Sequence, residues 1–158
     1  MAQRGFTLIA VMVALVLLAL ATQGVMFVAS QQAQRDREAE LLRVGNEFVR
    51  AIAAYYESSP GSVKTLPATL QDLEEDRRFV SVRRHIRRLY GDPMTGGRDW
   101  QLVRRPDGSI QGLYSSSEMT PVRTAAVDLG GVQLPEANHY SDWKFVFVPA
   151  PVVPAAGR

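Results

Sequence analysis

The longest apolar stretch in the chain covers residues 6–29. Twenty of its 24 residues are apolar, and no charged residue lies between Arg4 and Arg35. Because a helix that crosses the hydrocarbon core of a membrane needs about 20 mostly apolar residues, we predict a transmembrane helix over residues 6–30. Arg4 is the only charge before this helix, so the positive-inside tendency predicts a single pass with a cytoplasmic N-terminus.

After this stretch the apolar residues recur with the period of a helix. Their spacings of three and four residues predict an amphipathic helical half over residues 31–57, with one apolar face. The residues of this face are Leu41, Val44, Phe48, Ile52 and Tyr55. The charges between Arg35 and Arg43, Glu38 among them, are those expected where a helix leaves a membrane. Turn-forming residues at 58–61 predict the end of the helix.

Residues 58–148 predict a small head of mixed helix and strand. Thr69 is a candidate N-cap for a short helix, with Asp72 three residues later. Residues 98–115 predict an antiparallel hairpin, because their turn has proline at its second position and glycine at its fourth. Aromatic residues alternate with other residues from 143 to 148, which predicts a final strand with its aromatic face inward.

The rest of the chain carries weaker patterns. Residues 116–140 are poorly periodic, and the Pro/Ala-rich residues 149–158 predict a disordered tail. Together these patterns predict an α+β chain, in which one long N-terminal helix packs its amphipathic half on a small antiparallel sheet.

Composition narrows the class of protein. The 158 residues fit one domain, and 46% hydrophobic with 22% charged residues exclude a disordered chain. The absence of cysteine excludes a disulfide scaffold, thiol catalysis and cysteine-ligated zinc. A net charge of +2 is too small to indicate a nucleic-acid partner.

The start of the apolar stretch carries a more specific pattern. Arg4 is followed by Gly5 and then by Phe-Thr-Leu-Ile at residues 6–9, where the uncharged run begins. This junction resembles the leader junction of type IV pilins and type II secretion pseudopilins. The resemblance implies that residues 1–5 are a leader, that a prepilin peptidase cuts between Gly5 and Phe6, and that Phe6 is then N-methylated. It also implies a pilin-like fold, whose apolar helix serves as membrane anchor and filament core.

Two other interpretations of the N-terminus stay open. An ordinary secretory signal would use residues 6–18 as its apolar region and Ala19-Leu20-Ala21 as its cleavage site. A plain signal anchor would be retained without processing. The apolar residues that resume at 25–29 favour retention, because a mature soluble protein has little use for them.

One residue departs from the pattern of this family. The fifth mature residue is usually glutamate, and here it is Ala10. The resemblance implies that in this family the carboxylate pairs with the terminal amine of a neighbouring subunit. Such a partner is needed because an unpaired carboxylate in a membrane is costly. Ala10 cannot form this pair, which favours a minor, priming or tip-located role. A divergent or engineered subunit is a second explanation, and the simplest is that Ala10 is one more membrane-helix residue.

One segment of the head is similar to a segment found in the major pseudopilins. Residues 89–96 contain an Asp-Pro pair and a glycine turn, and a strand with an aromatic residue follows, as in the major pseudopilins. Trp100 is that aromatic residue, and we expect it to lie in the core between sheet and helix.

The resemblance also implies a calcium-binding loop in some major pseudopilins. Calcium requires six to eight oxygen ligands, several of them from carboxylates. Glu118, Asp128 and Asp142 are too few and too widely spaced to carry this site over. We therefore expect no cofactor and no metal.

Six arginines lie between residues 77 and 88. The candidates for contact with another subunit or with a polyanion are Arg83, Arg84, Arg87 and Arg88. DNA is one such polyanion, because some pilin-like proteins take up DNA. Acidic residues at 74–76 offset half of the charge, and few aromatic residues lie within the cluster. We therefore expect a solvated or subunit-contacting face rather than a nucleic-acid site.

The histidines and serines do not indicate an enzyme. His85 and His139 are the only two histidines, and neither lies in a mechanistic motif. His139 is close in sequence to Ser141 and Asp142, and three serines occur at 115–117, but no nucleophile elbow accompanies them. We predict a structural protein.

The resemblance implies a specific role. The expected protein is a type II secretion pseudopilin that waits in the inner membrane, with its head in the periplasm, and joins a short periplasmic filament that drives protein export. Its implied partners are other pseudopilins, the prepilin peptidase and the inner-membrane assembly platform. The alternatives are a minor pilin of a type IV pilus or DNA-uptake system, and a periplasmic protein with an ordinary signal peptide.

Overall fold

The computed structural model describes residues 3–97 and 100–149, with the side chains of residues 3, 4 and 20–28 left out. The chain divides into two compact units, Met1–Arg37 and Glu38–Arg158. Helix α1 spans Gln3–Glu57 and includes residues of both. The predicted tail lies outside the described residues, apart from Pro149.

In the second unit α1 has the predicted amphipathic face. All five of the predicted positions are at most 6% exposed, and Leu41, Val44, Phe48 and Ile52 are fully buried. The Phe48 ring meets the Trp100 ring edge to face, with centroids 5.8 Å apart. The prediction that Trp100 lies between helix and sheet is therefore confirmed.

Three strands form the main sheet. Strands β1 (Gln101–Arg104), β2 (Ile110–Tyr114) and β5 (Phe145–Val146) are antiparallel, in the order β1-β2-β5. The turn between β1 and β2 is closed by the Gly108 amide, which donates to the Arg105 carbonyl at 2.9 Å. Gly108 has a φ of +82°, a conformation that favours glycine. The predicted hairpin is confirmed.

The final strand is shorter than predicted. Trp143 and Phe145 are fully buried, and the Phe147 ring packs on Tyr56 with centroids 5.5 Å apart, so the aromatic face points inward as expected. Trp143 lies outside the strand because it follows the 3-10 helix η1 (Tyr140–Asp142). The main sheet takes up only Phe145–Val146.

Two segments differ from the sequence-based expectation. Helix α2 covers only Gln71–Glu74, and Thr69 is not its N-cap. The Asp72 carboxylate instead accepts the Thr69 amide at 2.8 Å and the Ala68 amide at 3.0 Å. The poorly periodic region contains a small hairpin of β3 (Val127–Asp128) and β4 (Gln133–Leu134).

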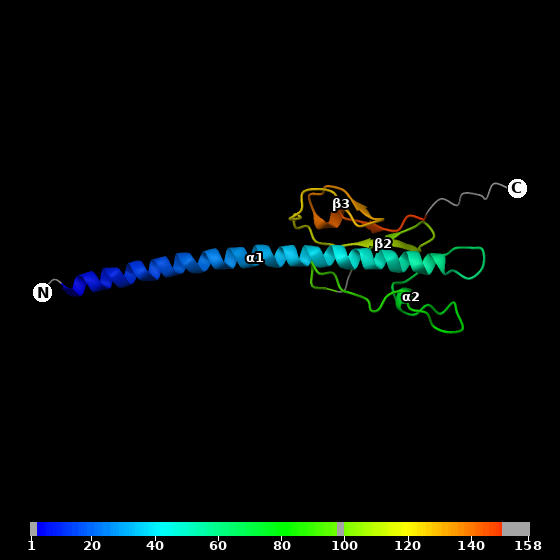
Figure 1. The fold of residues 1–158 in the computed structure, drawn as a ribbon, viewed down its shortest axis with the longest axis horizontal. Helices are drawn as coiled ribbons and strands as arrows, with labels where there is room; N and C mark the ends of the chain where they lie inside the picture. The colour runs from blue at the N-terminus through cyan, green and yellow to red at the C-terminus, as the bar shows by residue number, and fades with distance from the viewer. Residues whose placement is uncertain (1–2, 98–99, 150–158) are drawn as a thin grey trace. The chain divides into compact units, whose positions relative to one another are not determined.

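Helix α1 and strand β5 approach each other closely at Gly45. Figure 1 shows the strands along one side of the second half of α1, with α2 beside the other. A Cβ atom on Gly45 would overlap the Phe145 ring, and one on Gly112 would overlap the Phe145 backbone. These two glycines therefore make room for the fully buried Phe145 between α1 and β2.

This packing predicts the effect of a methyl group at Gly45. We expect Gly45→Ala to lower the free energy of unfolding by about 1–3 kcal/mol, because the Phe145 ring has to move. In a Phe145→Ala background the added methyl group has room, and Gly45→Ala should then stabilise α1 by about 1 kcal/mol through helix propensity. Denaturant unfolding of the full chain in a neutral detergent measures both values. An equal loss in the two backgrounds would contradict the close approach.

Candidate functional site

The first candidate site is the apolar segment at the start of α1. From Phe6 to Leu18 the large apolar side chains are 53–76% exposed, and they occupy every side of the helix. Phe6, the predicted first mature residue, is 76% exposed. A helix that is apolar all round is normally covered by lipid or by other protein, because exposed apolar area is unfavourable in water.

The residues predicted for processing lie at the start of this segment. Gly5 has open space where a side chain would be, and it lies in the first turns of α1 together with Phe6. Ala10 is exposed and presents a methyl group where the family has a carboxylate. Within the described part of the chain, no helix is both long and apolar enough to cross a membrane.

The second candidate site is the arginine cluster on the head. Arg83 pairs with Asp76 in an isolated antiparallel bridge, which closes a loop whose tip, Val80, is fully exposed. The four predicted residues are all exposed: Arg83, Arg84, Arg87 and Arg88. None of these four guanidinium groups forms an ion pair with a carboxylate of the described residues.

Two of these arginines contact aromatic rings instead. The Arg83 guanidinium lies 4.1 Å from the Phe79 ring centroid, and that of Arg88 lies 4.8 Å from the Tyr90 centroid. Such cation–π contacts hold the side chains in place without neutralising their charge. The cluster therefore presents a positive surface.

Asp76 behaves differently from the other charges of this region. The sequence predicted that it offsets the arginines as one of three acidic neighbours, but its carboxylate is buried and bonded. It accepts hydrogen bonds from Arg78 Nη2 at 2.7 Å and Nε at 2.9 Å, and its Oδ2 lies 3.0 Å from His85 Nε2. His85 is therefore part of a structural network.

The same network caps the end of α1. The Arg78 guanidinium donates to the Tyr55 carbonyl at 2.8 Å and stacks 3.4 Å from the centre of the Tyr55 ring. Lys64 donates to the Glu57 carbonyl at 2.6 Å. Carbonyls in the last turn of a helix lack helical partners and carry partial negative charge, so both cations stabilise this end. No short-range sequence pattern marks this network.

Glu38 is a second buried carboxylate that the sequence did not distinguish. It was expected among charges at the membrane exit, but it is only 2% exposed. Its Oε2 accepts the Tyr140 hydroxyl at 2.8 Å and the Val122 amide at 2.7 Å, and its Oε1 lies 3.4 Å from Arg123 Nε. Glu38 therefore ties the 120s loop and η1 to α1.

The described histidines and serines do not form a catalytic arrangement. His139 Nδ1 lies 2.7 Å from the Glu118 backbone carbonyl, and Ser115 Oγ donates to the buried Asp92 carboxylate at 2.7 Å. Asp92 also accepts the Met94 amide, which holds the Asp-Pro turn. Nowhere in residues 3–97 and 100–149 do three or more histidine, aspartate or glutamate side chains lie together in a way that would hold a metal ion.

The Asp76 network predicts a pH-dependent contribution to stability. Hydrogen bonds from Arg78, supported by His85, hold the pKa of the Asp76 carboxyl well below its usual range. Because the pKa is lower in the folded than in the unfolded chain, the stabilisation is complete at neutral pH and is lost as pH falls below about 4. We expect Asp76→Asn to cost about 2–3 kcal/mol at pH 7, since charged hydrogen bonds are removed.

Unfolding curves between pH 7 and pH 2 measure this effect. The difference between the wild type and Asp76→Asn should narrow as pH falls below about 4. Glu75→Gln is the matched control, because Glu75 is exposed and bonds only the exposed Arg77 among the described residues. A difference that stays constant with pH would contradict the role given to the ionised carboxylate.

Comparison with known proteins gives one match. Residues 1–22 match the family model described as the prokaryotic N-terminal methylation motif. No curated protein and no solved structure matches the chain. The matched family is structural and not enzymatic, in agreement with the prediction of a structural protein. The motif and the α+β pilin-like fold support a type IV pilin-like protein, a membrane-anchored precursor that prepilin peptidase processes and that assembles with other pilin subunits.

Proposed function

We propose that this protein is a pseudopilin of a type II secretion system. One observation carries the proposal: an apolar segment, exposed on every side, follows the Arg4-Gly5-Phe6 junction, while the second half of α1 is buried in a small α+β head. The first half of the helix therefore needs cover from outside the chain. Lipid before assembly and neighbouring subunits afterwards provide it.

The chain divides by role along its length. Residues 1–5 are the leader, and prepilin peptidase cuts between Gly5 and Phe6, after which Phe6 is N-methylated. Residues 6–30 form the single membrane pass and later the filament core. Residues 31–57 carry the head of residues 58–148, and residues 149–158 are the tail.

Assembly follows from the physics of helix packing. The protein waits in the inner membrane, N-terminus in the cytoplasm and head in the periplasm, before an assembly platform adds it to a short filament. Lipid tails are as apolar as these side chains, so close packing between helices has to offset extraction from the membrane. Contacts that repeat without closing produce a filament rather than a ring.

Ala10 gives the subunit a particular place in this scheme. It offers no carboxylate for the terminal amine of a neighbour, although its position in the apolar segment matches that of the family glutamate. The subunit is therefore a minor, priming or tip component, whose incorporation depends on the head as well as on the helix.

The mature N-terminus tests this proposal. Mass spectrometry of the membrane-bound protein should find a chain that begins at Phe6 and carries one added methyl group. Gly5→Val is the matched control, because a branched side chain before the cut should block cleavage and leave a full-length precursor. A soluble protein that begins at Thr22 would contradict the proposal, as would an unprocessed wild-type chain.

A minor pilin of a DNA-uptake system is the second candidate. The observation that favours it is the set of four exposed arginines that form no ion pair with a described carboxylate. DNA affinity of the detergent-solubilised chain should then fall steeply with salt, and combined glutamine substitutions at these arginines should abolish it. Secretion defects in the deletion strain, without such affinity, support the pseudopilin instead.

A further inference from the structure

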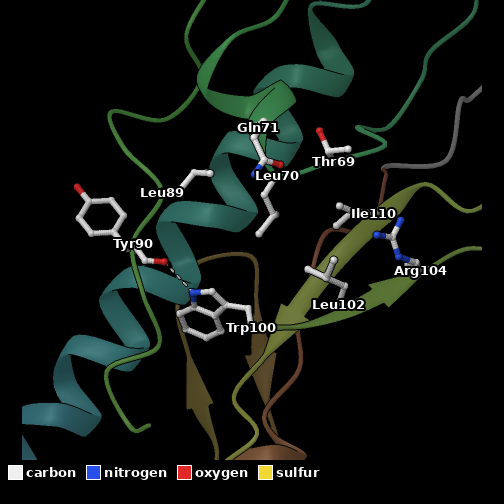
Figure 2. Close-up of a pocket in the computed structure, with 9 residues that line it drawn as sticks. All are labelled: Thr69, Leu70, Gln71, Leu89, Tyr90, Trp100, Leu102, Arg104 and Ile110. Carbon is white, nitrogen blue, oxygen red and sulfur yellow. Dashed lines mark hydrogen bonds between the residues drawn. The ribbon is translucent and has the colours of Figure 1, made fainter. Parts of the chain in front are cut away.

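The head contains a cleft that neither the N-terminal motif nor the arginine cluster explains. It encloses about 410 Å³ between α2, the segment before β1 and the first two strands. Figure 2 shows its lining, in which four aliphatic residues come from four separate segments. These residues are Leu70, Leu89, Leu102 and Ile110.

The floor of the cleft is apolar and firmly held. Ile110 is fully buried, and Trp100 is 7% exposed. The Trp100 indole donates to the Tyr90 carbonyl at 2.9 Å, which fixes the ring below the opening (Figure 2). Leu70 and Leu102 are half-buried, so each still offers apolar surface to an incoming side chain.

One end of the cleft carries positive charge. Arg104 and Tyr90 lie on opposite sides of the lining in Figure 2. Arg88 lies over the Tyr90 ring, but the Tyr90 hydroxyl donates to the Glu47 carboxylate at 3.3 Å, so the Tyr90 end carries both signs of charge. Arg104 donates to the Gly108 carbonyl at 2.6 Å and to the Ala68 carbonyl at 3.3 Å, and it forms no ion pair with a described carboxylate.

We infer that this cleft docks an extended segment of a partner protein, in which an aliphatic side chain lies beside an acidic residue. The apolar floor takes the aliphatic side chain, and Arg104 pairs with the neighbouring carboxylate. Exposed Thr69 and Gln71 line the cleft and supply hydrogen-bonding groups for the backbone of the segment.

The lining favours a peptide over a nucleic acid here. Binding of single-stranded nucleic acid uses exposed aromatic faces on which bases stack. Trp100 is buried, and the exposed residues of the lining, Thr69, Gln71 and Arg104, are not aromatic. A volume of about 410 Å³ holds one or two side chains, which suits a short linear segment.

A labelled peptide tests the inference directly. The probe is a fluorescein-labelled Gly-Asp-Glu-Leu-Glu-Asp-Gly peptide, titrated with the full chain in a neutral detergent while fluorescence anisotropy is followed. We expect saturable binding that weakens about two- to fivefold with Arg104→Gln. Replacing the peptide leucine with serine should weaken binding by about tenfold or more, because the apolar contact is lost.

Arg105→Gln is the matched control, because Arg105 is exposed, adjacent to Arg104 and outside the cleft lining. It should leave the affinity unchanged, and a peptide with lysine in place of each acidic residue should not bind. Absence of binding to the acidic peptide would overturn the inference. So would an equal loss with Arg105→Gln, or equal affinity for the serine peptide, since both indicate attraction by net charge alone. None of these outcomes depends on how the N-terminus is processed.

Discussion

The structure depends on how α1 buries its apolar side chains. In the second unit, Leu41, Val44, Phe48 and Ile52 are fully covered by strands and loops of the head. In the first unit, the large apolar side chains from Phe6 to Leu18 are all more than half exposed. The head therefore accounts for one stretch of the helix and leaves the other to lipid or to other subunits. This unequal cover agrees with the proposed role of the segment, first in a membrane and then in a filament.

Buried carboxylates hold the loops of the head in place. The chain has no cysteine, and its loops are held by Glu38, Asp76 and Asp92, each at most 2% exposed. Glu38 holds the 120s loop and η1, Asp76 holds the end of α1, and Asp92 holds the Asp-Pro turn. Every buried polar side-chain atom of the described residues has a hydrogen-bond partner. Buried polar groups that are fully bonded favour one arrangement of the loops, because any other arrangement leaves a carboxylate unsatisfied.

Sequence patterns predicted the parts of the fold that depend on local periodicity. The buried face of α1, the hairpin with its Gly108 turn and the inward aromatic face near β5 follow from spacing and turn chemistry alone. The burial of Glu38 is set by tertiary contacts, because Tyr140 lies 102 residues from it in sequence. Asp76 bonds the nearby Arg78 and His85, but its burial depends on the contact of Arg78 with the end of α1, which no local pattern marks. The cleft was missed for the same reason, since Leu70, Leu89 and Leu102 meet only in the folded head. The β3–β4 hairpin did carry a local sign, because Gly130-Gly131 supplies two residues with positive φ at its turn.

The central claim is that the apolar segment is retained and covered by other molecules. Thiol labelling tests it directly, because the chain has no cysteine of its own. Variants with the single substitution Leu15→Cys in the segment, or Ala54→Cys at an exposed site in the second half of α1, are treated with a maleimide in intact membranes. We expect rapid labelling at residue 54, and labelling at residue 15 only after the sample is denatured. Equally rapid labelling at both sites, or no label at residue 15 even after denaturation, would contradict it.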